Sequence, residues 1–575
     1  MSAQLLSQIR DSLSDAGLDG LYLGRSDKFQ GEEVRPCDEY LAWLTGFTGS
    51  AGAAVVLSEQ AAVFSDGRYI LQMANQLDSA LFDAVDIIET SPISWLAGKL
   101  ASGKIGYDGW QVTKSAYDRM VTTAPNIEFV ALEPEFLSGH WQDRPAETQA
   151  PIWRPDPKIC GQDSSEKLQQ IADELASKQA DFALVTSAET VNWMLNIRGR
   201  DLEHTPFHLC YALVSTAGEV TLIGADSAAG YHNFGFDQLD QLLASISNSN
   251  GAPAILADPD SLCMTLYSAM MAAGIQLTFR EEPLIYAKAI KNRAELQGFE
   301  QAHIKDGVAM VRFSHWLKTD EARRQMTEAD IASQLVSFRG QDAEYICDSF
   351  ATIAGFNANG AIVHYRAEKG ADAPLSGDGV LLVDSGAHYQ MGTTDITRTF
   401  ALGSVSADAV KAASLVLAAH AELARCIFPE GTNGVQLDAI ARQPLWQYGF
   451  DYGHGTGHGV GHILGVHEGP ASISKRGTKP IKAGYILSNE PGYYKAGSFG
   501  IRQENLVKIV QAKTGYLGME SLTLCPFDRD LIDISLFTDD QRDWLNSYHR
   551  HVYEVLAPYL DDTLRQWLLE QTASL

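Results

Sequence analysis

The sequence contains no block of consecutive basic residues, and its 44 lysines and arginines are outnumbered by 72 aspartates and glutamates, giving a net charge of −28 over 575 residues. This excess of negative charge repels other polyanions, which argues against nucleic acid or an anionic membrane surface as a partner. No apolar run is long enough to span a bilayer, and charged residues interrupt the N-terminal leucines, as in an amphipathic helix rather than a signal peptide. We therefore expect a soluble protein of the cytoplasm.

Several common catalytic motifs are missing as well. The seven cysteines are scattered and include no CxxC pair, which argues against a disulfide framework and suits a reducing compartment. Neither GxGxxG nor GxxxxGK followed by Ser or Thr occurs, so nothing indicates dinucleotide or phosphate-loop chemistry, and no GxSxG locates a serine nucleophile. His467 and Glu468 begin like the zinc motif HExxH, but Ala471 stands at the position of its second histidine.

Two features divide the chain into domains. Four prolines between residues 144 and 158 cannot continue regular structure and indicate a linker near residue 150. On either side of it the sequence partly repeats, because EYLAWLTGFTG at 39–49 aligns with ETVNWMLNIRG at 189–199 and each copy lies between two short apolar runs. This pattern is typical of strand, helix and strand in two related α/β domains, with a chance similarity as the alternative.

A third domain begins after PLIYAKAIKN at 283–292, where a long helical pattern starts, and it holds every dense cluster of chemical residues. We expect two α/β domains at residues 1–150 and 151–285, followed by an α+β catalytic domain at 286–575. The first two domains would then shape the molecule and control the access of substrate.

Residues 451–469, which read DYGHGTGHGVGHILGVHEG, combine four histidines with seven glycines. A helix is disfavoured because each glycine in a helix interior costs about 1 kcal/mol relative to alanine. In a strand, which has a period of two, His454, His458 and His462 would share one face and the glycines the other. The bare face would indicate close packing behind a site, whereas a glycine-rich loop with solvated histidines is the alternative.

Carboxylates form the second cluster. Residues 379–400, GVLLVDSGAHYQMGTTDITRTF, predict an antiparallel hairpin that brings Asp384 and Asp395 side by side. Two carboxylates held close together persist only if they share a proton or a cation. Glu490 in NEPGYY and Glu504 in GIRQENL provide two more acids. Any one of the four could be a surface acid, so the interpretation rests on the set.

Four carboxylates and the imidazole of His458 make an oxygen-rich set with one nitrogen, which favours Mn²⁺, with Co²⁺ or Zn²⁺ as alternatives. The four negative charges would neutralise two divalent ions. The predicted site is therefore a two-metal centre, with ions about 3.5–4 Å apart, that converts a bridging water into hydroxide and polarises a carbonyl.

These motifs resemble those of the aminopeptidase P family, the Xaa-Pro aminopeptidases of the pita-bread metallopeptidase superfamily (M24-type), in its long three-domain form. The matching segments run in order along nearly the whole chain: GFTGSAGAA, FSDGRYILQ, NWMLNIRGRDLEHTP, GAIVHY, LLVDSGAHY, GTTDITRTF, HGTGHGVG, VHEGP, NEPGYY, GIRQENL and DWLNSYH. The resemblance implies two creatinase-like α/β domains, a pita-bread catalytic domain and a homodimer.

The resemblance also assigns roles to individual residues. It implies that two divalent ions per subunit are held by five side chains, namely Asp384, Asp395, His458, Glu490 and Glu504. Asp395 and Glu504 would bridge both ions. Glu490 would accept and shuttle a proton as the bridging hydroxide attacks the carbonyl before proline.

Substrate contacts follow from the same resemblance. His364 and His467 would contact the peptide group and the developing oxyanion, where hydrogen-bond donors are most effective. His454 would line the pocket. Arg502 would fix the ligands or bind substrate, with a plain salt bridge to one of the acids as the alternative, and Tyr494 is a further candidate.

The implied activity is release of the N-terminal residue from peptides with proline in second position. A dipeptide-only prolidase is the nearest alternative, and the three-domain length favours the peptide-cleaving form. The complete ligand set disfavours a metal-free creatinase-type hydrolase and a non-catalytic pita-bread binding protein.

His462 has no implied role. The C-terminal aromatics either form a dimer contact or pack within their own domain: Trp544, Tyr548, Tyr553 and Tyr559.

Overall fold

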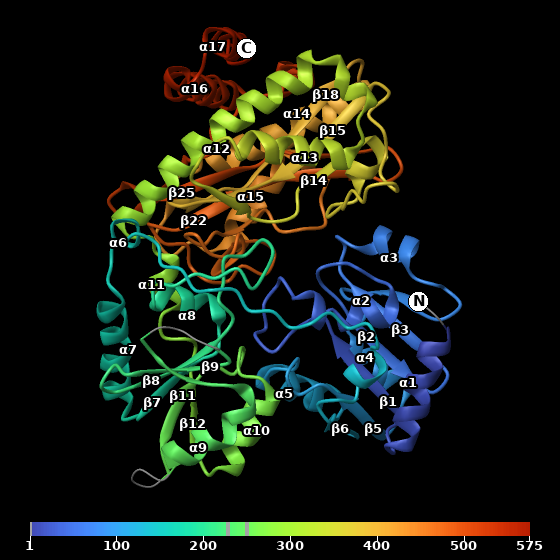
Figure 1. Ribbon diagram of the computed structural model, residues 1–575. Coiled ribbons are helices and arrows are strands. Elements are labelled where there is room, and N and C mark those ends of the chain that lie inside the picture. The colour runs from blue at the N-terminus through green and yellow to red at the C-terminus, as the bar shows by residue number, and fades with distance from the viewer. Residues whose placement is uncertain (1–2, 226–229, 248–251) are drawn as a thin grey trace. The chain divides into compact units, whose positions relative to one another are not determined.

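The computed structural model describes residues 3–225, 230–247 and 252–575. The chain forms two compact units (Figure 1). The N-terminal unit comprises Met1–Arg154 and Gln162–Ile285, and the C-terminal unit comprises Pro155–Gly161 and Tyr286–Leu575. The proline-rich linker therefore contains the point where the chain first passes from one unit into the other.

The N-terminal unit contains two six-stranded sheets. Their strands are β1 (Gly20–Gly24), β2 (Ala53–Leu57), β3 (Ala61–Ser65), β4 (Asp83–Asp86), β5 (Gly103–Tyr107), β6 (Ile127–Ala131), β7 (Phe182–Val185), β8 (Tyr211–Ser215), β9 (Val220–Ile223), β10 (His232–Phe234), β11 (Ala254–Ala257) and β12 (Gln276–Phe279). The sheet orders are β4-β3-β2-β1-β5-β6 and β10-β9-β8-β7-β11-β12. In both, the first three strands along the chain pair antiparallel and the other neighbours pair in parallel.

Helices cover both faces of the first sheet. The helices of the unit are α1 (Ala3–Asp15), α2 (Tyr40–Thr45), α3 (Ile70–Gln76), α4 (Pro92–Lys99), α5 (Lys114–Thr123), α7 (Ser164–Lys178), α8 (Ala188–Met194), α9 (Leu239–Ser247) and α10 (Met264–Ala272). One buried apolar cluster joins this sheet to α1, α2 and α3, and a second joins its other face to α4 and α5. The corresponding positions of α2 and α8, and the identical sheet orders, confirm the predicted pair of related α/β domains.

The C-terminal unit is a mixed α/β structure with four sheets. Its strands are β13 (Tyr345–Asp348), β14 (Ile353–Phe356), β15 (Gly379–Ser385), β16 (Ala387–Tyr389), β17 (Gly392–Thr393), β18 (Ile396–Leu402), β19 (Phe428–Pro429), β20 (Gly457–Gly459), β21 (Glu468–Ile473), β22 (Ile486–Asn489), β23 (Gly492–Lys495), β24 (Phe499–Arg502), β25 (Asn505–Lys513) and β26 (Tyr516–Ser521). The largest sheet has the order β19-β26-β25-β22-β20-β21, and β14-β15-β18, β13-β16-β17 and β23-β24 form the others.

The helices of this unit follow from simple sequence signals. They are α6 (Pro157–Cys160), α11 (Ile285–Ala289), α12 (Arg293–Thr319), α13 (Glu328–Arg339), α14 (Ala407–Ala424), α15 (Gly434–Trp446), α16 (Asp539–Leu556) and α17 (Asp562–Gln571). The long helix expected after residue 292 is confirmed as α12, and Asn292 begins it because its side-chain oxygen accepts from the backbone N–H groups of Ala294 and Glu295. Proline at the first position of α6 is compatible with a helix, since its missing N–H would have no partner there.

Helix α14 is the centre of the apolar core. Its sequence, ADAVKAASLVLAAHAELA, is rich in alanine, and most of its residues are buried. Small side chains let neighbouring elements approach closely, and α14 contributes to three separate core clusters of the unit. The sheets that carry the charged residues described below are therefore backed by a tightly packed helix.

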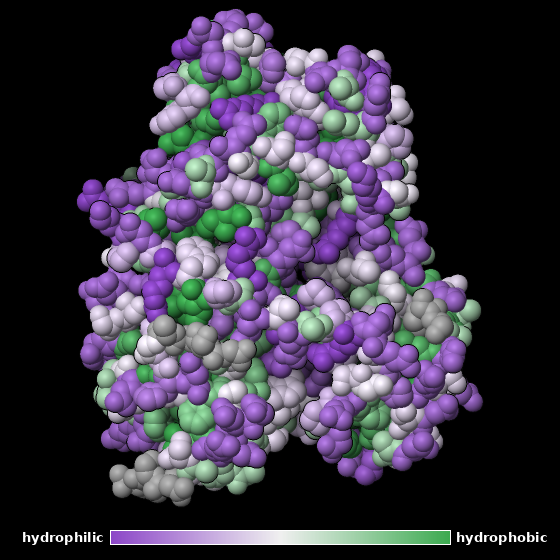
Figure 2. Space-filling model, viewed as in Figure 1, coloured by the Kyte–Doolittle hydropathy of each residue, from purple (hydrophilic) through white to green (hydrophobic). Residues whose placement is uncertain are grey.

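The surface seen in Figure 2 is mostly hydrophilic, with hydrophobic residues in scattered groups. Within the described part of the chain, no helix is both long and apolar enough to cross a membrane. Of the C-terminal aromatics, Tyr548 is buried and stacks on Trp544 with ring centroids 5.5 Å apart, so these two pack within their own domain. Tyr559 is 56% exposed.

Two buried histidines predict acid sensitivity of the fold. Burial and the charge of Arg398 lower the pKa of His420 and of His549 to about 3, from 6.5. The unfolded chain then takes up protons that the native state excludes, so the free energy of unfolding falls as the pH drops from about 6.5 towards 3. At pH 5 each histidine should cost about 2 kcal/mol.

This prediction is tested by urea unfolding of metal-free wild type and His420→Phe at pH 7 and pH 5. The variant should lose about 2 kcal/mol less than wild type between the two pH values. His551→Gln changes an exposed histidine of α16 and should behave as wild type. Equal losses in wild type and His420→Phe would contradict the assignment.

Candidate metal centre

The first two carboxylates come from one hairpin. Strands β15 and β18 pair antiparallel, with Asp384 opposite Thr397, so the predicted hairpin is confirmed. Asp384 lies near the end of β15, and Asp395 immediately precedes β18. Both are buried, at 8% and 4% exposure. A hairpin made mostly of buried apolar residues thus holds two acids at its end, inside the unit.

The two glutamates lie at the ends of strands that follow later in the chain. Glu490 comes directly after β22, and Glu504 lies between β24 and β25 and is 2% exposed. The hydroxyl of Thr397 donates to a carboxylate oxygen of Glu504 at 2.7 Å, and the backbone N–H of Glu504 donates to the carbonyl of Thr397 at 3.1 Å. The hydroxyl of Ser488 donates to Glu490 Oε1 at 3.1 Å. Each glutamate is thereby oriented by a hydroxyl.

His458 lies at the middle of β20, which has only three residues. The strand predicted across the histidine run is therefore confirmed only for Gly457–Gly459. The close packing expected behind it is present, because a Cβ at Gly457 would lie 2.0 Å from the carbonyl oxygen of Ser488 and one at Gly459 2.2 Å from that of Glu468. Side chains at these two positions would push apart the strands that flank His458.

The expected single face of histidines is wrong for His462. The chain turns after β20, and His462 lies in that turn. Its Nε2 lies 2.8 Å from the carbonyl oxygen of Met391, and its ring packs on Phe299 at 5.6 Å between centroids. The two-residue period of a strand extends over only three residues here, so it cannot place a residue beyond the turn on the same face as His458.

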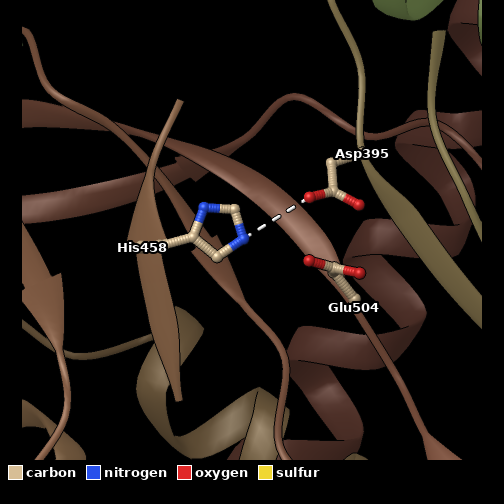
Figure 3. Close-up of side chains that lie close together, drawn as sticks. All are labelled: Asp395, His458 and Glu504. Atoms are coloured by element: carbon tan, nitrogen blue, oxygen red, sulfur yellow. Dashed lines mark ion pairs between the residues drawn. The ribbon is translucent and has the colours of Figure 1, made fainter. Parts of the chain in front are cut away.

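Three of the five predicted ligands meet at one point (Figure 3). The candidate ligand atoms of Asp395, His458 and Glu504 all lie within 4.8 Å of one another. His458 Nε2 is 3.5 Å from Asp395 Oδ2 and 3.4 Å from Glu490 Oε1, so a fourth predicted ligand lies beside them. The fifth, Asp384, is close enough for its charge to interact with those of Asp395 and Glu490.

Burial and repulsion by neighbouring charges disfavour the ionised forms of Asp384, Glu490 and Glu504. Burial raises the pKa of Glu504 well above its usual value, and the charges of Asp395, Glu490 and Asp384 raise it further. Burial also raises the pKa of Glu490, with Asp395 and Asp384 adding to it against the opposing effects of His458 and Arg502. The pKa of Asp384 is raised by burial in spite of its ion pair with Arg502. A cation between the carboxylates would remove this repulsion.

Two features of the side chains fit a metal ion. The buried Oδ1 of Asp384 has no hydrogen-bond partner among the described residues, although its other oxygen is paired. His458 Nδ1 lies 2.9 Å from the carbonyl oxygen of Gly459, which can only accept, so Nδ1 carries a proton and Nε2 is the nitrogen that faces Asp395 and Glu490. Histidines that ligate metals are commonly fixed in this way.

Arg502 links the acids to an aromatic network. Its guanidinium donates to Asp384 Oδ2 at 2.5 Å, to the hydroxyl of Tyr494 at 2.6 Å and to the hydroxyl of Thr397 at 3.2 Å. The salt bridge considered as an alternative for Arg502 is therefore present. The Tyr494 hydroxyl lies 2.8 Å from His454 Nε2, and His454 Nδ1 lies 2.7 Å from the carbonyl oxygen of Gly455. Asp384, Arg502, Tyr494 and His454 thus form one hydrogen-bonded chain.

The other two predicted substrate histidines lie on irregular segments. His467 is exposed and directly precedes β21, and its ring centroid is 4.2 Å from that of His458 at an interplanar angle of 85°. His364 is half-buried in a turn, and the carbonyl of its neighbour Val363 accepts from Arg502 at 3.4 Å. The structure therefore brings His467 to the ligands and the backbone beside His364 to Arg502.

Several supporting residues were not identified from the sequence. Thr397 shares a strand face with Asp395, which was a usable signal, whereas Ser488 was visible only as a neighbour of Glu490. Glu468 is buried and forms ion pairs with Lys288, at 3.0 Å, and with Lys291. These lysines lie nearly 180 positions earlier in the chain, and no local pattern connects them with Glu468.

Comparison with known proteins places these features in a family. Sequence models of the creatinase/prolidase N-terminal domain match residues 6–138 and 143–295. The model of metallopeptidase family M24 matches residues 297–511, and that of the C-terminal region of peptidase M24 matches residues 515–575. Two creatinase-type domains followed by an M24 domain with a buried carboxylate centre define the chain as a metallopeptidase.

Relatives of similar length show which kind of metallopeptidase the chain resembles. Aminopeptidase P2 of Arabidopsis thaliana is 35% identical over 99% of this chain and 88% of its own length. A probable Xaa-Pro aminopeptidase P of Laccaria bicolor is 34% identical over 100% of this chain and 94% of its own. The crystal structure of the X-prolyl aminopeptidase of Caenorhabditis elegans, described as a cytosolic enzyme with a di-nuclear active site, matches all of both chains with a TM-score of 0.92 at 28% identity. The chain belongs to the Xaa-Pro aminopeptidase P family.

The carboxylate cluster predicts an unusual effect of Glu504→Gln. In the metal-free protein the native state holds the Glu504 proton more tightly than the unfolded chain does, so ionisation at neutral pH lowers stability. Removing that charge should raise the Tm of the metal-free protein at pH 7, by about 2–4 °C for each kcal/mol of relief. It should also reduce the rise in Tm on adding Mn²⁺, because a ligand is lost.

Calorimetry of the metal-free and Mn²⁺-loaded forms measures both effects. Glu430→Gln alters an exposed glutamate of the same unit and should match wild type in both. A lower Tm for metal-free Glu504→Gln would show that the charge of Glu504 does not destabilise the metal-free protein. An unchanged rise in Tm on adding Mn²⁺ would show that Glu504 is not a metal ligand.

Proposed function

We propose that the protein hydrolyses the Xaa-Pro bond at the N-terminus of peptides and releases the first residue, using two divalent ions held by the five predicted ligands Asp384, Asp395, His458, Glu490 and Glu504. The observation that carries the proposal is the convergence of Asp395, Glu490 and Glu504 on His458, while one oxygen of Asp384 has no hydrogen-bond partner among the described residues. Family membership supports the same activity.

When bound, the two ions would lower the pKa of a water molecule and polarise the scissile carbonyl. Glu490 is the proton acceptor and shuttle. Ser488 holds its Oε1, while its Oε2 lies 4.0 Å from His454 Nδ1. The carboxylate is thus fixed at one oxygen, and the other oxygen is available for a proton.

His467 and His364 donate hydrogen bonds to the peptide group and to the oxyanion that develops on the carbonyl oxygen. Donors fixed in place before the reaction stabilise this charge without reorganisation. His454, hydrogen-bonded to Tyr494, lines the pocket. Arg502 holds Asp384 and Tyr494 in position by donating a hydrogen bond to each. These five residues surround the ligands without replacing any of them.

The chemistry of proline suits such a site. An Xaa-Pro bond is a tertiary amide without an N–H, so a binding site has no donor to satisfy on the proline side. Recognition can then rest on the carbonyl, which the two histidines address, and on the free amine of the first residue, which is attracted by the acids. General peptidases that need the N–H are disfavoured.

Peptide rather than dipeptide cleavage is supported by the full length of the chain. The X-prolyl aminopeptidase of C. elegans and aminopeptidase P2 of Arabidopsis thaliana match 100% and 99% of the chain. We further propose domain boundaries at residues 1–150, 151–285 and 286–575. The family-model ranges support them.

The oxygen-rich donors favour Mn²⁺, with Co²⁺ or Zn²⁺ as alternatives. We also propose a homodimer in the cytoplasm. The exposed ring of Tyr559 is available for a subunit contact, and the description of the C. elegans enzyme as cytosolic supports the location.

The activity is tested with metal-stripped protein and the tripeptide Arg-Pro-Pro. Adding Mn²⁺, Co²⁺ or Zn²⁺ separately should restore release of free arginine, because each can occupy an oxygen and imidazole site, and Mn²⁺ should restore most. Asp395→Ala should abolish the restored activity, because it removes one of the residues that would hold the ions. Chromatography of the released arginine measures the rate.

The dipeptide Arg-Pro is the matched substrate. Cleavage of the dipeptide but not the tripeptide would assign a prolidase activity instead. Two bound ions without cleavage of either substrate would favour a binding function.

His467→Ala tests the oxyanion contact. Loss of one oxyanion donor should lower kcat by about 10²–10³-fold. KM should change little, because the interaction forms mainly in the transition state. His462→Gln is the matched control, since His462 is hydrogen-bonded to Met391 outside the site, and its kcat should stay near wild type. Equal losses in the two variants would argue against a specific role for His467.

A further inference from the structure

We propose that Asp438 and Arg442, on α15, are positioning residues that fix the glycine-rich segment carrying His454 and, through Thr456, the backbone of Glu490. The proposal rests on the proposed function in one respect, namely that Glu490 is a ligand and proton acceptor. Within the described part of the chain, neither Asp438 nor Arg442 forms a hydrogen bond or an ion pair with the acids of the centre, so their effect would be indirect.

Arg442 binds the segment at several points. Its side chain is 1% exposed, and it donates to the carbonyl of Tyr452 at 2.8 Å and to the carbonyl of His454 at 2.7 Å. It also pairs with Asp438 at 2.8 Å and with Asp451 at 2.6 Å. Its guanidinium carbon lies 3.8 Å from the ring centroid of Tyr452. One arginine thus holds both carbonyls that flank Gly453.

Asp438 continues the connection towards the metal ligands. It lies one helical turn before Arg442 and accepts from the hydroxyl of Thr456 at 2.6 Å. The carbonyl of Thr456 accepts from the backbone N–H of Glu490 at 2.8 Å. Thr456 is fully buried and contacts the hydroxyl of Tyr452 as well. Three hydrogen-bonded steps therefore join Arg442 to the backbone of Glu490.

The glycines of this segment explain why the hydrogen bonds from Arg442 and Asp438 are needed. Residues 453 and 455 are glycine, and a Cβ at Gly453 would meet nothing within 4 Å, so packing does not restrict its conformation. Glycine has the greatest backbone freedom of all residues. Without external hydrogen bonds the segment would sample many conformations, and His454 and Glu490 would move with it. Arg442 supplies those bonds from a rigid helix.

Arginine is suited to this task in a way that lysine is not. Its planar fork presents five N–H donors in fixed directions, and here it serves two carboxylates and two carbonyls together. Lysine would keep the positive charge beside Asp438 but could not reproduce this geometry. The substitution Arg442→Lys therefore separates geometry from charge.

The test measures Mn²⁺ binding and catalysis in the full-length protein. Arg442→Lys and Asp438→Asn should weaken the binding of Mn²⁺ by about tenfold or more in titration calorimetry, because the ligand Glu490 loses its support. At saturating Mn²⁺, kcat for Arg-Pro-Pro should fall by about 10–100-fold while KM stays nearly constant. Thr456→Val removes only the hydroxyl that Asp438 binds and should give the same pattern to a smaller degree.

Arg323→Lys is the matched control. Arg323 is a buried arginine of the same unit, 5% exposed, and its backbone hydrogen bonds go to Asp320 and Met326, away from the site, so the variant should bind Mn²⁺ and turn over as wild type. If Arg442→Lys and Asp438→Asn do not fold, Thr456→Val alone decides. Wild-type affinity and kcat in the folded variants would overturn the proposal.

Failure of the proposed function gives a different result. If wild type binds Mn²⁺ without cleaving peptide, the aminopeptidase assignment fails. The difference in Mn²⁺ affinity between Arg442→Lys and Arg323→Lys would still test the positioning role.

Discussion

Repulsion among buried carboxylates is the constraint on which the C-terminal unit depends. Asp395 and Glu504 meet at His458 with Glu490 beside them, in a region where burial already disfavours charge. No lysine forms an ion pair with these three acids among the described residues, and the salt bridge of Arg502 goes to Asp384. Cations bound between the carboxylates would remove this repulsion. The metallopeptidase chemistry follows from this unbalanced charge.

The residues around the centre show how an enzyme can fix the position of segments that have no regular secondary structure. The three histidines assigned to substrate lie on turns or irregular stretches, and a buried charged side chain lies behind each stretch. Arg442 holds the segment of His454, and Glu468, beside His467, is paired with Lys288 and Lys291. Helices supply most of these anchors because their positions are set by the core.

The segment of His364 has an anchor of the same kind. Glu328, the first residue of α13, is fully buried and accepts from the hydroxyl of Tyr365 at 2.7 Å and from the backbone N–H groups of Phe356 and Ala373 at 2.6 and 2.9 Å. A buried carboxylate that forms no ion pair within the described part of the chain is stable only if it is fully hydrogen-bonded. The hydrogen bonds of Glu328 to Phe356 and Ala373 therefore fix the chain on both sides of His364. The helices of the fold thereby determine where the irregular segments lie.

The sequence by itself determined the elements and the chemistry, because both depend on neighbours in the chain. Apolar runs predicted β1, β2, β7 and β8. An apolar run that ends at Asp384, followed by a β-rich run around Asp395, predicted their hairpin, and the combination of acids with His458 predicted a metal centre. Only the tertiary structure decided where the histidine run leaves its strand, that Arg502 pairs with Asp384, and that Arg442, Glu328 and Lys291 support the site. Those contacts join residues from separate elements, and local patterns carry no information about which distant side chain will fill a buried position.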